Sequence, residues 1–422
     1  MEATDVWTLA STALVLIMTP GLALFYGGLV RVRSVVNMML FSVSAMGVVG
    51  VLWILFGYSM SYFSDGESGF AGSPFKEFGL LATDPADFIG IGFGAVFAMI
   101  TTALISGAIA DRVGLGSWVL FSGVWASLVY FPVAAWVWGG GWISQLGTWL
   151  GAPDVIDLAG GTAIHINAGA AALALAIVAG KRRGFGPGSH KPHSVPLVTI
   201  GAALLWFGWI GFNAGLATEV GEAGLILVNT LGAPAAGIIG WLITDVIRGR
   251  KPGVIGAASG AIAGLVAITP AAANLSPLWA LLLGLIAGAA CAVAIDLKYR
   301  LGYDDSLDVV GLHLVAGVIG TLYLGFFAFE DGLFVGGSAG LLLVQAISVF
   351  GAMIYSFVVS LIIALVVKAL TGLRVPTQVE EEGIDTFAHG EEAYDYLPDS
   401  GATETVAGPV RSGSAEPVGA GR

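Results

Sequence analysis

The sequence predicts an all-α integral membrane protein with eleven transmembrane helices. Of its 422 residues, 56% are hydrophobic and only 11% are charged, a composition far from that of soluble globular proteins. Most of the uncharged stretches are long enough for an apolar helix to cross a hydrocarbon core of about 30 Å. These stretches cover residues 6–30, 34–64, 88–110, 113–153, 158–180, 194–218, 223–244, 252–295, 309–329 and 333–367.

Two of the stretches are about twice the length that one span requires. In 113–153 we expect one span that ends near Trp138, followed by a glycine-rich re-entrant or surface segment. The 252–295 stretch is interrupted by Thr269-Pro270 and by Pro277, which are turn signals that divide it into two spans. The total is therefore eleven.

The distribution of lysine and arginine predicts the orientation of these spans. Basic residues cluster in alternate loops, with Lys76 as the exception: Arg31 and Arg33; Arg112; Lys181, Arg182, Arg183 and Lys191; Arg248, Arg250 and Lys251; Lys298 and Arg300; and Lys368 and Arg374. Because basic loops favour the cytoplasm, the N-terminus is predicted outside and the C-terminus inside. An odd number of spans is then required, which agrees with eleven. No basic residue precedes the first stretch, so we interpret it as a span rather than a cleaved signal peptide.

Two histidines lie inside otherwise apolar spans and in matching surroundings. The pattern Asp-x7-His-x2-Ala-Gly runs from Asp157 through His165 and again from Asp305 through His313. An ionisable group at membrane depth is costly unless it faces a pore or a partner, so each histidine is a candidate site residue. Their places in spans five and ten, which run in opposite directions, indicate a five-plus-five inverted repeat followed by one further helix. The two histidines are then expected to meet near the midplane.

Other interpretations of these residues remain open at this point. A buried histidine can simply bond a backbone carbonyl, and Asp157 can act as the N-cap of the fifth span or supply negative charge near the outer mouth. Two histidines with no third ligand give little reason to expect a metal. We expect no cofactor and no enzymatic activity. Residues 376–422 carry ten acidic and two basic residues, or −8 of the formal −12, so the membrane part is only weakly acidic, and no nucleic-acid partner is expected.

Several motifs, in order along the chain, resemble those of the ammonium transporter (Amt/Mep/Rh) family, nearer its bacterial Amt branch. They are Phe25-Tyr26-Gly27-Gly28-Leu29, Trp138-Gly139-Gly140-Gly141, Asp157 to Gly169, Gly208 to Gly215, Asp308 to Gly317, Gly372-Leu373-Arg374-Val375 and His389 to Tyr394. The similarity covers about residues 6–394. It implies a homotrimer in the cell membrane with one conduction path per subunit, surrounded by lipid. Its substrates would be ammonium or ammonia, with methylammonium as a further candidate.

The resemblance also implies roles for individual residues. Trp138 corresponds to the outer recognition tryptophan, whose ring face can hold a cation with about 0.5–2 kcal/mol. Phe97 and Phe212 correspond to two stacked phenylalanines that close the pore, and Trp209 to an aromatic beside the second. His165 and His313 correspond to the family's twin histidines, which line the pore and can relay a proton. Without the resemblance, Trp138 would be interpreted as part of the interfacial aromatic belt and each Phe as packing.

Two positions depart from the family pattern. Leu216 stands where the family usually has a serine hydroxyl of the outer site, and Gly94 follows Phe93 where a glutamine is often found. A leucine cannot accept a hydrogen bond, so recognition would depend on Trp138 and water. Asp157 is expected to act on the ion through hydrogen bonds rather than by contact.

We divide the chain into a transmembrane domain (1–371), a structured cytoplasmic tail (372–394) and a disordered acidic C-terminal tail (395–422). The resemblance implies a PII-type signal protein as a partner of the structured tail. The predicted function is ammonium uptake: recognition outside, deprotonation, and passage of ammonia along the histidines with linked proton transfer. The alternatives are an ammonium sensor that signals through its tail and a passive pore for a small neutral solute.

Overall fold

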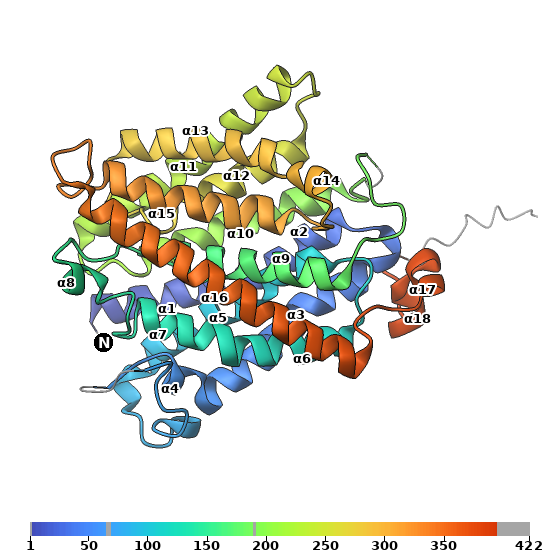
Figure 1. The fold of residues 1–422 in the computed structure, drawn as a ribbon, viewed down its shortest axis with the longest axis horizontal. Coiled ribbons are helices and arrows are strands. Elements are labelled where there is room, and N and C mark those ends of the chain that lie inside the picture. Colours follow the sequence, from blue (N-terminus) through green and yellow to red (C-terminus); the bar gives the residue numbers. More distant parts are fainter. Residues whose placement is uncertain (1, 65–68, 189–190, 395–422) are drawn as a thin grey trace, which may run out of the picture.

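The computed structural model describes residues 2–64, 69–188 and 191–394. Within this part of the chain the regular structure is helical, apart from an isolated antiparallel bridge between Val113 and Arg374. The predicted disordered tail, 395–422, lies outside the described residues. The long helices lie side by side, and the N-terminus and the tail helices are at opposite ends of the bundle (Figure 1).

Ten helices of the described residues are long and apolar enough to cross a membrane. They cover Ala3–Leu29, Val32–Met60, Pro85–Ile109, Leu115–Val137, Gly161–Ala179, Val195–Ala214, Val220–Ile247, Pro277–Leu301, Val310–Phe327 and Ala339–Thr371. A shorter apolar helix, α12 (Val254–Ile268), completes the eleven. The predicted all-α membrane fold is therefore confirmed.

Both long uncharged stretches divide where the sequence predicted. The fourth span ends with α7 (Phe131–Val137), and a turn through Gly139–Gly141 follows, leading to the short helix α8 (Leu146–Leu150). In the second stretch, α12 ends at Ile268 and α13 (Pro277–Ala294) begins at Pro277. Proline has no backbone N–H, and it is tolerated there because the N–H groups of a helix's first turn have no partner within the helix.

The second half of the bundle packs through glycines. α11 (Val220–Ile247), α12 and α13 approach one another so closely that a Cβ at Gly288 would lie 2.1 Å from the carbonyl oxygen of Gly237. A Cβ at Gly237 would in turn lie 2.3 Å from the carbonyl oxygen of Gly260. Small residues are what allow helix backbones to pack this tightly in lipid, where no hydrophobic force drives them together.

The fifth and tenth spans begin in the same unusual way. Each starts with a π-helical turn that carries a histidine, η7 (Gly161–Ile166) and η8 (Val310–Leu314), and continues as α9 (Asn167–Ala179) and α15 (Val315–Phe327). The residue three positions after the aspartate of each repeated pattern has a positive φ, 107° at Gly160 and 63° at Asp308. The two halves thus repeat a local backbone shape as well as a sequence pattern.

The last two helices of the described residues are short, α17 (Thr377–Glu382) and α18 (Ile384–His389), and they dock on the end of the bundle (Figure 1). The carboxylate of Asp385 accepts hydrogen bonds at 2.9 Å from the backbone N–H groups of Val36 and Asn37, in the first turn of α3 (Val35–Leu52). Burial raises the pKa of Asp385, although those N–H groups oppose the shift. Arg374 donates to the carbonyl oxygen of Ala179, the last residue of α9, and to that of Lys181 just beyond it.

Candidate conduction site

A cavity of about 230 Å³ opens on the N-terminal side of the bundle. Its walls are mainly aromatic; they consist of Trp53, Ser61, Tyr62, Gly90, Phe93, Gly94, Phe97, Tyr130, Ala134, Trp138, Leu158 and Leu216. Trp138 follows α7, and its indole N–H donates to the carbonyl oxygen of Asp157 at 2.9 Å. Trp138, Phe97 and Leu216, singled out from the sequence, therefore border one space.

Two phenylalanine rings separate this cavity from the interior. Phe97 on α5 (Phe88–Ile105) and Phe212 on α10 (Val195–Ala214) stack with their centroids 4.3 Å apart and their planes inclined by 15°. Both side chains are buried. An apolar constriction of this kind resists a hydrated ion more than a small neutral molecule.

The histidine pair lies beyond the phenylalanines. His165 and His313 meet with their Nδ1 atoms 3.2 Å apart, and their rings stack with centroids at 5.3 Å. A neutral imidazole has one donor and one acceptor nitrogen, so one ring donates and the other accepts. Nε2 of His165 is buried and has no hydrogen-bond partner. The pair borders a small cavity of about 20 Å³, room for one or two molecules the size of water.

Trp209 links the phenylalanine and histidine levels. Its ring stacks on His165 at 5.5 Å and lies 5.4 Å from Phe212. The indole N–H donates to the hydroxyl of Thr269 at 2.8 Å, at the end of α12. Other walls of the inner cavity are hydrocarbon, such as Leu22, Ile100 and Leu312. The polar atoms available to a molecule in it are therefore few.

Asp157 is not among the lining residues of the outer or the inner cavity, although its neighbour Leu158 lines the outer one. Its carboxylate accepts backbone N–H groups of Gly160, Gly161, Thr162 and Ala163 at 2.5–3.2 Å, at the start of the span that carries His165. Asp305 does the same for the other span, accepting from Val309 and Val310. Because the N–H groups at a helix start lack partners in the helix, these carboxylates fix where each histidine segment begins.

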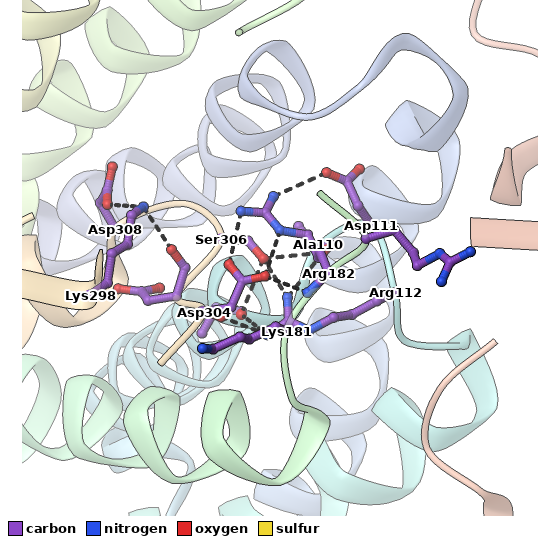
Figure 2. A network of polar contacts seen from close by, with 12 residues as sticks. Ala110, Asp111, Arg112, Lys181, Arg182, Lys298, Asp304, Ser306 and Asp308 are labelled. Carbon is purple, nitrogen blue, oxygen red and sulfur yellow. Dashed lines mark hydrogen bonds and ion pairs between the residues drawn. The ribbon is translucent and has the colours of Figure 1, made fainter. Parts of the chain in front are cut away.

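Buried charges hold the loop that leads to His313 (Figure 2). The guanidinium of Arg112, which is fully buried, donates to the carbonyl oxygen of Asp304 at 2.6 Å and to the hydroxyl of Ser306 at 2.5 Å. Arg182 pairs with Asp304 at 3.0 Å and with Asp111 at 3.3 Å. Burial lowers the pKa of Arg112 to about 10. This network joins the ends of the third and fifth spans to the start of the tenth.

Two residues of this arrangement, Trp53 and Thr269, were not singled out from the sequence. Trp53 lies beside Gly94 in the outer cavity, and Thr269 fixes Trp209. Neither contact leaves a signal in the sequence, because each joins spans that are far apart in the chain. Among the described residues, no three His, Cys, Asp or Glu side chains gather so that they could hold a metal ion.

A bundle of apolar spans with a narrow path of aromatic and imidazole groups through its interior is typical of membrane channels and transporters for small solutes. The family model described as the Ammonium Transporter Family matches residues 6–394. An ammonium transporter of Mycobacterium tuberculosis is 47% identical over 94% of this chain and 91% of its own length. An ammonium transporter of Bacillus subtilis is 43% identical over 90% of this chain and 96% of its own. The chain therefore belongs to the ammonium transporter family.

Solved structures agree with this assignment. A protein named "Sensor Amt Protein" superposes with a TM-score of 0.84 at 28% identity, covering 92% of this chain and 98% of its own. Mep2 of Candida albicans superposes with a TM-score of 0.81 at 33% identity, covering 89% of this chain and 86% of its own. The predicted family and the multi-pass location in the cell membrane are confirmed. The function is ammonium transport, and the members of this family are transporters rather than enzymes.

Proposed function

We propose that ammonium is recognised in the outer cavity, gives up a proton to water there, and crosses the bundle as ammonia along His165 and His313. The observation that carries the proposal is the Nδ1···Nδ1 contact of 3.2 Å, which lies directly beyond the stacked Phe97 and Phe212 rings. A path of this kind combines an apolar barrier with a hydrogen-bonding pair. It suits a small molecule that is neutral and polar.

In this proposal, ammonium is recognised mainly by an aromatic side chain. The ring face of Trp138 attracts a cation through its quadrupole, and its indole N–H is already committed to Asp157. Leu216 offers no acceptor, so water completes the coordination of the four N–H groups. Asp157 acts through its backbone hydrogen bonds, which position the His165 segment and the Trp138 ring together.

The histidines act as a coupled unit. Placing a positive charge on both rings would cost several kcal/mol in desolvation and repulsion, so the pair is neutral or shares one proton. The unpartnered Nε2 of His165 can accept from or donate to an ammonia molecule in the small cavity, depending on the tautomer. The Nδ1 contact lets one proton pass between the rings, which supplies a route for linked proton transfer.

We further propose that the protein works as a homotrimer and that residues 372–394 form a structured cytoplasmic tail to which a PII-type signal protein binds. The contacts of Asp385 on α18 with the start of α3, and of Arg374, just before α17, with the end of α9, support the tail proposal.

A sensor role is the second candidate, because one of the similar solved structures is that of a protein named "Sensor Amt Protein". Growth on limiting ammonium, in cells that lack other ammonium carriers, separates the two roles. Rescue by this chain supports transport as its role in the cell. A folded protein that does not rescue growth supports the sensor.

A further inference from the structure

The outer cavity is richer in ring faces than in hydrogen-bond acceptors. Six aromatic side chains line it: Trp53, Tyr62, Phe93, Phe97, Tyr130 and Trp138. Among the described residues of its wall none is a carboxylate, and the side-chain acceptors are the hydroxyls of Ser61, Tyr62 and Tyr130. Such a wall attracts positive charge but does little for N–H donors.

Trp53 gives the cavity a second indole beside Trp138. A Cβ at position 94 would lie 2.6 Å from Cζ2 of Trp53, so the indole can pack against α5 only because residue 94 is glycine. The indole N–H donates to the carbonyl oxygen of Ile91 at 2.9 Å, and the ring meets Phe131 edge to face at 5.7 Å. These contacts fix the ring in the wall.

The cavity is also larger than ammonium requires. It offers about 230 Å³, whereas about 10–15 Å³ on the same measure is enough to hold a water molecule, which is similar in size to ammonium. Ammonium brings four N–H donors, which is more than the three side-chain hydroxyls of this wall. A cation whose hydrogens are replaced by methyl groups fills more of the space and needs no acceptors. Aromatic walls are well suited to quaternary ammonium groups.

We propose that this cavity binds small quaternary ammonium cations, with Trp53 and Trp138 as its two indole walls, and that such cations block ammonium entry. The Phe97 and Phe212 rings, stacked at 4.3 Å, leave a bulky cation no way inward, so it occupies the cavity without crossing. The inference rests on the proposed role of the cavity as the entrance. It adds a ligand class and a residue, Trp53, to that role.

Tetramethylammonium is the probe for this proposal. Its equilibrium binding is measured on the full chain in lipid nanodiscs, and its effect on methylammonium uptake is measured in proteoliposomes. We expect saturable binding and competitive inhibition, in which the half-saturating methylammonium concentration rises and the maximal rate is unchanged. tert-Butanol, which is similar in shape but uncharged, should do neither. Inhibition that lowers only the maximal rate would place the ligand elsewhere and overturn the proposal.

Variants then test the wall. Trp53→Leu should weaken tetramethylammonium binding by about 2- to 30-fold, the range expected for one cation–π contact. Trp149→Leu is the matched control, because Trp149 is 60% exposed and lies outside the cavity. If Trp53→Leu does not fold, Gly94→Ala displaces the indole without removing it and should also weaken binding, whereas Trp53→Phe should weaken it less.

Two outcomes separate this inference from the transport proposal. Normal ammonium uptake without tetramethylammonium binding would overturn the inference and leave transport in place. Tetramethylammonium binding by a protein that conducts no ammonium would contradict the transport proposal instead. Binding that neither Trp53→Leu nor Gly94→Ala changes would remove Trp53 from the site.

Discussion

Leu216 is the residue whose chemistry most directly limits ammonium recognition. Its side chain borders the outer cavity with Trp138 and Phe97, where it cannot accept a hydrogen bond. Leu216→Ser adds an acceptor and should strengthen apparent ammonium binding by up to about 1 kcal/mol, or roughly 5-fold in half-saturating concentration. Concentration-dependent uptake measures this. Leu216→Ala removes similar bulk without a hydroxyl, and equal effects of the two changes would mean that volume matters, not the hydrogen bond.

Asp157 tests whether a buried carboxylate serves structure or charge. It accepts four backbone N–H groups at the start of η7, so Asp157→Ala should lower the free energy of unfolding by about 1–3 kcal/mol. Asp157→Asn keeps one acceptor oxygen and should cost less. Thermal unfolding in detergent measures both. If the folded Asp157→Asn protein loses uptake while its stability is near that of the wild type, the charge itself is needed.

At this scale, sequence reasoning reached the residues that stand in recognisable motifs. His165 and His313 could be named because their spacing and neighbours form a repeated pattern, and Trp138 because its motif resembles that of the family. Trp53 could not, because its place depends on the missing side chain of Gly94, about 40 residues away in another span. Partners across spans are set by packing, which a single sequence does not display.

Among the elements, the tail helix α18 makes the most specific contact with the bundle. Asp385 caps the first turn of α3, and a lost cap typically costs about 0.5–2 kcal/mol. Asp385→Ala should therefore loosen the tail and lower ammonium flux in proteoliposomes. Glu391→Ala, an exposed acidic position of the same tail, is the control and should leave flux unchanged. Equal flux in the wild type and both variants would show that docking of α18 does not matter for transport.

Truncation addresses the boundary of the tail. Removing residues 395–422 should leave flux intact, because the docking contacts lie before that segment, whereas ending the chain before Gly372 removes α17 and α18 and should lower it. Flux is compared at equal amounts of reconstituted protein. If a well-folded protein loses flux when 395–422 are removed, the functional part of the tail extends beyond residue 394 and the assigned boundary is wrong.

Element boundaries followed from charge and turn chemistry, but helix shape did not. Pro277 and the glycines after Trp138 placed the ends of spans correctly. The π-helical starts η7 and η8 were not predicted, since their geometry depends on the carboxylates of Asp157 and Asp305 and on the packing of the two segments.

For the whole molecule, the alternation of basic loops predicts an outer N-terminus and a cytoplasmic tail. Thr4 and Lys251 are exposed at positions predicted to lie on opposite sides of the membrane. With Cys291 replaced by alanine, Thr4→Cys should react with a membrane-impermeant thiol reagent in intact cells, and Lys251→Cys only after lysis. Cys291 is buried, so the unaltered protein should stay unlabelled. The reverse labelling pattern would invert the assigned orientation.

The central claim, that His165 and His313 form the selective element of the path, is tested most directly by currents on solid-supported membranes. Wild-type protein should respond to ammonium pulses and not to potassium. His165→Ala and His313→Ala each break the Nδ1 contact of 3.2 Å, and each should lose the selective ammonium response. His165→Glu retains a group able to line the path and relay protons, so it should keep conduction but alter the exclusion of potassium. If both alanine variants fold as the wild type does, conduct ammonium at its level and still exclude potassium, the histidines are packing residues and the claim is wrong.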